Sequence, residues 1–382
     1  MHTSSILLDY QSSTPCHEEV IEVMKPFWIE IFSNPSSKSN LASISANAAL
    51  EVSREKITNE LKLKNKKIIF TSGATESNNL ALLGYARSFY NQNGSFGHII
   101  TLKTEHQAVL EPIRQLQKEG FTVSEISPES DGLISIDKLL NAIKSDTFLI
   151  SVMLANNEIG VIQPLNSIYE ICQAKHIVLH TDAAQCPGYL PINYFNSIAN
   201  MITLSSHKIY GPKGVGLLIL DKNIEIKPIL FGGGQEFGLR AGTIPLPLIV
   251  GFSKAIELAV KNQKRNSFQL SLHRDNLLNG LLANDSQIYI NGSMVSRLPH
   301  NLNVTFPGIS GSKLHKHLKS KIICSSGSAC SNGKPSHVLT SIGRTFNEAE
   351  SSIRLSIGLM TTRNEITSAI SIINNVVSNL RQ

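Results

Sequence analysis

Short apolar stretches typical of buried strands alternate, over much of the chain, with stretches that have the apolar spacing of helices. The strand-like stretches are residues 67–70, 98–101, 147–152, 177–180 and 201–204. Helical patterns such as residues 108–119 and 168–175 lie between them. Because parallel strands need crossovers that helices usually supply, the alternation favours a mostly parallel sheet covered by helices. We therefore predict an α/β fold with a large, mostly parallel-sheet domain.

The pattern changes after Gly251. A long helical stretch runs from about Phe252 to Leu282, and short strand-like pieces follow at residues 288–290 and 301–306. We therefore place a domain boundary near residue 260. This gives a large domain over residues 13–260, and a smaller α+β domain formed by residues 1–12 and 261–382.

Composition and charge exclude several classes of protein. Of the 382 residues, 41% are hydrophobic and 17% are charged, which is ordinary for a globular chain and not for a disordered one. No apolar run approaches the roughly 18–20 residues that span a bilayer. The first residues lack the basic region of a signal peptide, so we expect a cytoplasmic protein with no membrane contact. The net charge of +6 comes from spread lysines, densest at residues 62–67 and 313–321, which we interpret as solvated element ends, so nucleic-acid contact is not expected.

The five cysteines differ in their surroundings. Their number is odd and no Cys-x-x-Cys pair is present, so we expect reduced thiols. Cys330 lies in the stretch SSGSACSNGK, whose small residues are typical of a mobile loop that presents an exposed side chain. Cys324 closes an apolar run and is expected to be buried, although a redox pair with Cys330 is the alternative. We expect no metal ion, and Cys330 is the one candidate ligand of an iron–sulfur cluster.

Lys208 stands where a lysine that condenses with an aldehyde is expected. It follows the strand-like stretch 201–204 and precedes a turn rich in glycine and proline, which lets the backbone pass close to a ligand. A lysine held on a rigid element and partly removed from water can react as a neutral amine. Ser205 and His207 flank it and could donate hydrogen bonds to a phosphate. Taken alone, the motif could also be a surface lysine before a turn.

Asp182 follows another strand-like stretch, and ligands of open α/β sheets bind beyond the carboxyl ends of strands. A carboxylate there can keep a pyridine nitrogen protonated, which makes the ring an electron sink. Gln185 can reach the phenolic oxygen of such a ring. Asp182 and Lys208 are separated by about one strand–helix–strand step, so both could face one crevice.

The segment from Thr71 to Ser77 combines a strand end, a glycine turn and a helix start. Free backbone N–H groups and the positive end of the helix dipole meet at such a point and can bind a phosphate. The segment matches neither the P-loop nor the G-x-G-x-x-G pattern. Thr75 or Ser72 could also cap the helix, and capping is compatible with phosphate binding.

His106 and Arg354 complete the candidates. His106 follows the stretch 98–101, where an imidazole could stack on a pyridine ring and move protons near neutral pH. Arg354 lies in a strand-like stretch, and its planar guanidinium suits two-point binding of an α-carboxylate. Taken alone, the histidine could be structural and the arginine could form a surface ion pair.

Together these segments resemble the cysteine desulfurases of the NifS/IscS type. The resemblance covers nearly the whole chain, and its motifs are TSGATESNNLA, KTEHQAVL, NNEIG, HTDAAQ, SSHKIYGPKGVG, GGGQEFGLRAGT, SSGSACS and SSIRLSIG. It implies the fold-type I architecture of enzymes that use pyridoxal 5′-phosphate (PLP). It also implies a homodimer with active sites at the subunit interface.

The resemblance assigns a role to each candidate residue. Lys208 would bond to the PLP aldehyde, Asp182 would pair with the ring nitrogen, Gln185 would contact the phenolic oxygen and His106 would stack on the ring. The residues expected to hold the phosphate are Ala74, Thr75, Ser205 and His207, with Thr243 from the other subunit, and Ser206 is also expected to bind the cofactor. Asn157 would contact the cofactor and the substrate, Arg354 would bind the substrate carboxylate, and Cys330 would be the nucleophile.

The implied activity converts L-cysteine to L-alanine. Lys208 would remove the α-proton, and the Cys330 thiolate would attack the substrate sulfur and keep it as a persulfide for an acceptor protein. A lowered pKa of Cys330, or a nearby base such as His106, would supply the thiolate. The acceptor could belong to iron–sulfur cluster assembly, tRNA thiolation or DNA phosphorothioation.

Two departures from the housekeeping members bear on the acceptor. Fewer residues separate Cys330 from Pro335, and after Gln382 we expect no C-terminal extension of the kind that docks an iron–sulfur scaffold. The nearest alternatives are selenocysteine lysis and aminotransfer on the same fold, and aminotransfer needs no thiol. A non-catalytic partner protein that only retains the fold is the remaining alternative.

Overall fold

The computed structural model describes residues 5–37, 39–191, 195, 198–326 and 335–382. The largest sheet in these residues has the strand order β2–β8–β7–β6–β5–β3–β4. Six strands run in one direction and β8 runs against them, so the predicted mostly parallel sheet is confirmed. The strands are β2 (Lys66–Thr71), β3 (His98–Leu102), β4 (Thr122–Ile126), β5 (Thr147–Ser151), β6 (Val178–Asp182), β7 (Met201–Ser205) and β8 (Gly216–Asp221).

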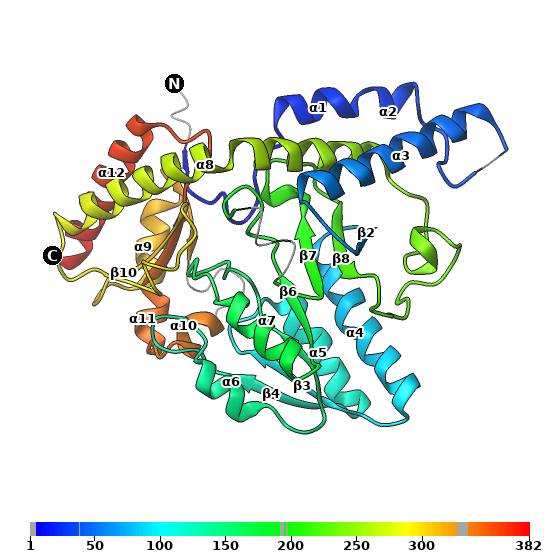
Figure 1. Cartoon of the computed structure of the whole chain (residues 1–382). Coiled ribbons are helices and arrows are strands. Elements are labelled where there is room, and N and C mark those ends of the chain that lie inside the picture. Colours follow the sequence, from blue (N-terminus) through cyan, green and yellow to red (C-terminus); the bar gives the residue numbers. More distant parts are fainter. Residues whose placement is uncertain (1–4, 38, 192–194, 196–197, 327–334) are drawn as a thin grey trace.

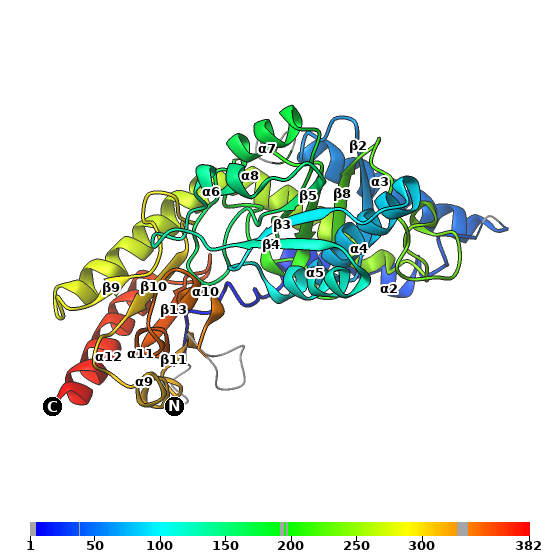
Figure 2. The ribbon, with the colours of Figure 1, turned by 90° about the horizontal axis from the view of Figure 1, so that it is seen from below.

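Helices cover both faces of this sheet (Figures 1 and 2). One face packs on α4 (Ala74–Asn93) and α5 (Gln107–Glu119), and the other on α3 (Leu41–Glu60), α7 (Leu165–Ala174) and α8 (Leu246–Leu282). Side chains of β2 alternate between the two cores, because Ile69 joins the core under α4 and α5, whereas Ile68 and Phe70 join the core under α3, α7 and α8. Burial on both faces explains why the central strands are almost entirely apolar in sequence.

A smaller antiparallel sheet follows, in the order β12–β13–β10–β9. Its strands are β9 (Tyr289–Ile290), β10 (Asn301–Thr305), β12 (Ser325–Ser326) and β13 (Ser352–Ser356). The helices of this part are α9 (Gly311–Leu318), α10 (His337–Ser341), α11 (Phe346–Glu350) and α12 (Arg363–Arg381). Beside it, β1 (Ile6–Leu7) pairs in parallel with β11 (Ile322–Ile323), so the start of the chain lies with its C-terminal third.

Helix α8 connects the two sheets (Figure 1). Its 37 residues pack on α3 at one end and on α12 at the other, and α1 (Glu18–Met24) and α2 (Pro26–Ile29) also lie against it. The helix is continuous through residue 260, where the sequence placed a boundary, and the division into two domains stays a prediction. The remaining elements are α6 (Ile136–Ala142), η2 (Ser206–Lys208) and η3 (Glu236–Gly238).

Two observations concern membranes and thiols. Among the described residues, no helix is long and apolar enough to cross a membrane. The four cysteines in the described ranges, Cys16, Cys172, Cys186 and Cys324, are free thiols. Cys324 is buried, as the sequence predicted.

Candidate active site

A cavity of about 700 Å³ lies at the carboxyl ends of the parallel strands and reaches the smaller sheet. It forms where β2, β3, β5, β6 and β7 end, because strands that run in one direction place their last residues at one edge. Ten of the residues predicted for the site line it: Ala74, Thr75, His106, Asn157, Asp182, Gln185, Ser205, His207, Lys208 and Arg354.

One end of the cavity is built around the start of α4. No side chain caps this helix, so the N–H groups of its first turn, at Ala74 and Thr75, stay available for an anion. The turn before it needs two glycines. Gly73 has a φ of +152°, and a Cβ on Gly216 of β8 would lie 2.7 Å from the Gly73 backbone.

Two side chains after β7 extend this end of the cavity. The hydroxyl of Ser205 is buried and has no hydrogen-bond partner among the residues the structure describes. Desolvation, with the nearby charges of Lys208 and Lys213, lowers the pKa of His207 to about 4. His207 is therefore a neutral imidazole at physiological pH, and its Nδ1 is 3.2 Å from the Ser13 hydroxyl.

Asp182 is the last residue of β6, and both of its carboxylate oxygens are hydrogen bonded. Asn78 of α4 donates from Nδ2 to Oδ2 over 2.7 Å, and the Ala184 N–H donates to Oδ1 over 2.9 Å. Gln185 donates from Nε2 to the carbonyl of Gln11 over 3.2 Å. These bonds fix the carboxylate in the cavity wall, where it can pair with a cationic ring nitrogen.

His106 is the N-cap residue of α5 and lines the cavity. Its Nδ1 accepts the Ala108 N–H over 3.0 Å, so a neutral ring carries its proton on Nε2. Desolvation lowers the pKa of His106, and the charge of Asp182 acts in the other direction. The neighbouring Glu105 is fully buried, and desolvation raises the pKa of its carboxyl well above the usual range. A neutral Glu105 leaves the pairing with a ring nitrogen to Asp182.

Lys208 ends the short helix η2 directly after β7. Its Nζ donates to the carbonyl of Gln11 over 2.8 Å and to that of Ser12 over 2.9 Å. The N-terminal segment therefore forms one wall of the site. Gln11 and Ser12 are 197 and 196 positions from Lys208 in the sequence.

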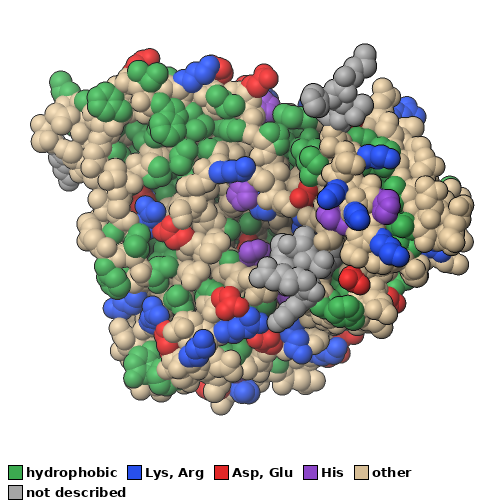
Figure 3. Space-filling model, turned by 180° about the vertical axis from the view of Figure 1, so that it is seen from behind, with side chains coloured by type: hydrophobic (Ala, Val, Ile, Leu, Met, Phe, Trp, Pro, Cys, Tyr) green, Lys and Arg blue, Asp and Glu red, His purple; other side chains and the backbone are tan. Residues whose placement is uncertain are grey.

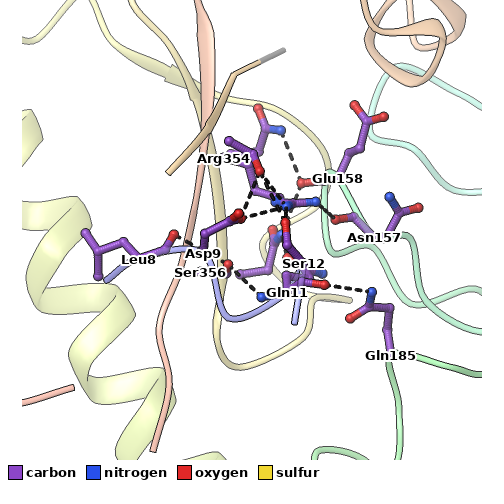
Figure 4. A network of polar contacts seen from close by, with 12 residues as sticks. Leu8, Asp9, Gln11, Ser12, Asn157, Glu158, Gln185, Arg354 and Ser356 are labelled. Carbon is purple, nitrogen blue, oxygen red and sulfur yellow. Dashed lines mark hydrogen bonds and ion pairs between the residues drawn. The ribbon is translucent and has the colours of Figure 1, made fainter. Parts of the chain in front are cut away.

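Arg354 of β13 closes the cavity on the side of the smaller sheet (Figure 4). Its Nη2 lies 2.7 Å from Asp9 Oδ1 and donates to the hydroxyls of Ser12 and Ser325, also over 2.7 Å. Its Nη1 donates to the carbonyl of Asn157 over 2.7 Å. The buried Nε has no acceptor among the described residues. A guanidinium held this firmly can present N–H groups to a carboxylate.

Two of the predicted residues that the structure describes do not line the cavity. Ser206 is buried behind it, with its backbone N–H bonded to Val215 and its carbonyl to Gly211. Thr243 is exposed in the loop before α8, and the role predicted for it belongs to a second subunit. Cys330 lies outside the described residues.

Sequence reasoning missed several contributors. Gln11, Ser12 and Ser13 line the cavity, yet no local pattern marks them because their partners lie far along the chain. Asn78 could have been found, because it follows the predicted phosphate turn by one helical turn, where a polar side chain that is fully buried needs a partner. Glu76 lines the cavity and pairs with Arg240 over 2.9 Å.

The residues present fit PLP. The open first turn of α4, the unpartnered Ser205 hydroxyl and His207 could hold a phosphate, and Asp182 could pair with a pyridine nitrogen. Lys208 could reach an aldehyde between these two ends, because it lines the same cavity. No group of three or more metal-ligating side chains occurs in the ranges that the structure describes.

Comparison with known proteins agrees with this geometry. The family Aminotransferase class-V matches residues 6–368. The cysteine desulfurase IscS of Histophilus somni is 42% identical over 383 residues, which cover 98% of this chain and 93% of that protein. A solved NifS-like protein superposes with a TM-score of 0.91 at 34% identity, covering 99% of this chain and 100% of the other. The structure of SspA in complex with cysteine has a TM-score of 0.79 at 36% identity, with coverages of 93% and 99%.

The match extends through both sheets and through every segment that lines the cavity. The fold is therefore PLP fold type I, as the sequence predicted. From the fold, the cavity and the match over nearly the full length, we conclude that the chain belongs to the class-V aminotransferase family of PLP-dependent enzymes.

Proposed function

We propose that the protein is a cysteine desulfurase that converts L-cysteine to L-alanine and receives the sulfur on Cys330 as a persulfide. The observation that carries this proposal is the single cavity in which Lys208, Asp182 and Arg354 meet. The full-length similarity to a named cysteine desulfurase, and to a protein solved with cysteine, selects the substrate. In the balanced reaction, L-cysteine and the Cys330 thiol give L-alanine and the Cys330 persulfide.

The cofactor would be held at both ends of the cavity. PLP, when bound, withdraws electrons from the substrate's α-carbon and so acidifies its proton. Ala74, Thr75, Ser205 and His207 would hold the phosphate, and Lys208 would bond to the aldehyde. Asp182 would pair with the ring nitrogen, and the two hydrogen bonds that it already accepts hold its carboxylate in position.

The substrate would lie between the two sheets. Arg354 would bind its carboxylate, with Asp9 and the Asn157 carbonyl holding the guanidinium in place. Once replaced by the substrate's amine, Lys208 would take the α-proton on Nζ, close to the carbonyls of Gln11 and Ser12 that already bind this atom. The arrangement therefore places a carboxylate anchor and a base on one substrate.

The sulfur step would use Cys330 and His106. The Cys330 thiolate would attack the substrate sulfur, so that the new S–S bond forms as the carbon–sulfur bond breaks and its electron pair stays on carbon. A proton then replaces the sulfur and alanine leaves. Because Nδ1 of His106 already accepts a hydrogen bond, the proton that this residue can donate is on Nε2.

We also infer a homodimer, which exposed apolar residues support. They gather on and near the N-terminal helices and in the loop before α8, and they are Trp28, Ile29, Phe32, Leu41, Phe231 and Phe237. Figure 3 shows hydrophobic side chains concentrated at its upper left, which after its half turn corresponds to the upper right of Figure 1, where α1 to α3 lie. Apolar area of this kind usually marks an interface. A second subunit there would also bring its own Thr243 near a phosphate site. Light scattering after size exclusion tests the dimer, and a monomer at micromolar concentration would contradict it.

The activity can be tested directly. The enzyme with PLP is mixed with L-cysteine and dithiothreitol, alanine is quantified, and peptides are examined by mass spectrometry for one added sulfur on Cys330. L-Selenocysteine is assayed beside L-cysteine to separate a desulfurase from a selenocysteine lyase. Lys208→Ala should bind PLP without the yellow absorbance of the lysine-bound cofactor. Alanine formation with sulfur on another cysteine, or on none, would contradict the role of Cys330. The cytoplasmic location and the identity of the sulfur acceptor stay predictions.

A further inference from the structure

A strongly basic segment immediately precedes the loop region of Cys330. Residues 311–326 contain four lysines and two histidines but no Asp or Glu. The structure places the first half of this segment in α9 and the second half in β11 and β12. In Figure 3, Lys and His side chains gather at the right, over the part of the molecule that contains the smaller sheet.

The lysines lie on the exposed side of α9 and just after it, whereas the other side of α9 is packed against the protein. Leu314 and Leu318 are fully buried, and the helix begins in contact with the neighbouring chain, because a Cβ on Gly311 would lie 1.6 Å from the Glu350 carbonyl. Lys313, Lys316, His317, Lys319 and Lys321 are exposed, and we call these five residues the α9 surface. None of its lysines forms an ion pair within the described ranges; elsewhere Lys25, Lys56, Lys66, Lys138 and Lys254 form one and most other described lysines do not, so the feature that distinguishes this surface is the density of its charges without any Asp or Glu among them.

Helix stability accounts for only part of this charge. Positive side chains near the C-terminal end of a helix stabilise it through the helix dipole, and His315, Lys316 and His317 stand in the last turn of α9. Lys313, however, stands near the N-terminal end, where the dipole disfavours a positive charge. Lys319 is the C-cap residue, where the dipole favours its charge, and Lys321 lies beyond the helix. The dipole therefore explains Lys316 and Lys319 but not Lys313 or Lys321, which favours a role in binding.

We propose that the α9 surface docks the acidic face of the protein that accepts sulfur from Cys330. The proposal rests on the function proposed above and adds the chemistry of the partner. Cys330 lies outside the described residues but follows Ser326, the last described residue of this segment, by four positions in sequence, and the proposal is that an acceptor bound here receives its persulfide sulfur. In the transfer, the acceptor thiolate attacks the outer sulfur, its new S–S bond forms, the bond to Cys330 Sγ breaks, and Cys330 leaves as a thiolate.

The composition of the surface favours a protein partner over a nucleic acid. Residues 311–326 contain no Phe, Tyr, Trp or Arg, so apart from His315 and His317 the segment lacks side chains on which bases stack. An apolar side chain, Ile323, is 47% exposed beside Lys321 and suits the core of a small protein interface. Complementary charge at such an interface acts mainly on the rate of association, by about 10-fold to 1,000-fold at low salt.

The experiment uses the full-length enzyme with PLP and a synthetic acceptor of defined charge. The acceptor is a peptide with one cysteine flanked by glutamates, and a second peptide has serines in place of the glutamates. The rate constant for transfer of the Cys330 persulfide sulfur to each peptide is measured by mass spectrometry at low and high salt. We expect transfer to the glutamate peptide to be roughly 10-fold faster at low salt, with the advantage lost at high salt because salt screens exposed charges.

A charge-reversal variant tests the surface itself. In one variant Lys313, Lys316, Lys319 and Lys321 are replaced by Glu, and we expect the preference for the glutamate peptide to disappear. A milder variant with the same four lysines replaced by Gln guards against a folding defect, and it should lose most of the preference. The matched control replaces four exposed lysines of the large-sheet region by Glu, which changes the net charge equally: Lys118, Lys175, Lys222 and Lys227.

The outcomes distinguish a failure of the docking proposal from a failure of the proposed desulfurase function. Equal transfer to both peptides, or a preference that persists in both α9 variants, would overturn the docking proposal while alanine formation with dithiothreitol stays intact. Loss of alanine formation in the unmodified enzyme would instead overturn the proposed function. Competition by added tRNA that depends on the α9 lysines, with no preference between peptides, would assign the surface to nucleic acid and also refute the proposal.

Discussion

The ion pair between Arg54 of α3 and Glu236 of η3 offers a quantitative test of how the loop before α8 is held. Nη2 of Arg54 lies 2.7 Å from Oε1 of Glu236, and Nη1 donates to Oε2 over 3.2 Å. Oε2 also accepts the Phe70 N–H over 2.8 Å. Glu236 has a φ of +45° and Phe237 one of +62°. Because non-glycine residues in this region cost about 1–3 kcal/mol each, the pair must oppose local strain.

Replacing Arg54 by Met keeps much of the side-chain volume but leaves a charged carboxylate without its partner. The Glu236 side chain is 1% exposed and that of Arg54 is 13% exposed. Removing one partner of a buried pair costs about 3–5 kcal/mol, and the slight exposure of Arg54 points to the lower end. Unfolding entropy near 2.1 cal/mol/K per residue gives about 0.8 kcal/mol/K for a chain of this length, so a loss of about 3 kcal/mol lowers the melting temperature by about 4 °C.

Urea denaturation and calorimetry measure the effect, at one protein concentration and with PLP in excess, since binding and association also stabilise the fold. Arg114→Met is the matched control, because Arg114 forms an exposed pair with Glu111 whose loss should cost less than about 1 kcal/mol. The double variant Arg54→Met/Glu236→Gln should recover at least half of the loss, because no unpaired charge remains. A loss below about 1 kcal/mol for Arg54→Met, or no recovery in the double variant, would refute the reasoning.

Three further predictions concern the cavity. Asn78→Ala removes the N–H donor to Asp182 Oδ2. Because a hydrogen bond to a charged group contributes about 1.5–3 kcal/mol, we expect PLP to bind about 10-fold more weakly. Spectroscopic titration measures the affinity for PLP, and an unchanged affinity would contradict the prediction. His207 has its pKa lowered to about 4, below the 6.5 of an unfolded chain, so its contribution to stability is fully present above pH 6.5 and is lost as pH falls from 6.5 to 4. In the enzyme without PLP, NMR should show no titration of His207 between pH 5 and 8, and a midpoint near 6.5 would be inconsistent with the desolvated site. Cys330→Ala should keep PLP and cysteine binding but lower alanine formation at least about 100-fold, as expected when an enzyme loses its nucleophile; full activity in that variant would exclude the persulfide.

The sequence predicted the strands on which the site depends, because burial on both faces makes them apolar throughout. The predicted strand at residues 98–101 and that at 201–204 are confirmed as β3 and β7, and the helix predicted from about Phe252 to Leu282 is confirmed within α8. Strand β8 was missed, although residues 216–221 are apolar, because they follow a glycine–proline turn that was interpreted only as a ligand-binding loop. Its antiparallel direction depends on neighbours in the sheet, which a local pattern does not encode.

The candidate site was predictable to the extent that its residues follow strand ends. Asp182, Lys208 and His106 each come shortly after a buried strand, so their convergence follows from parallel topology. Ser12 was missed because its bond to Arg354 joins residues 342 positions apart, and no sequence pattern reports such a contact. Ser206 was predicted to bind the cofactor because its neighbours in the motif do, but it is fully buried and does not line the cavity.

The unbroken course of α8 limits how the enzyme can change shape. A helix of 37 residues is a rod of about 55 Å, and rotating one half against the other would require breaking backbone hydrogen bonds at its middle. A closure of Arg354 toward Lys208 would therefore move the smaller sheet relative to this helix and leave the helix intact. The turn from Asp9 to Ser12 connects the two residues, because Asp9 and Ser12 bind Arg354 while the carbonyls of Gln11 and Ser12 bind Lys208. A substrate carboxylate that draws Arg354 inward would thus also displace this turn.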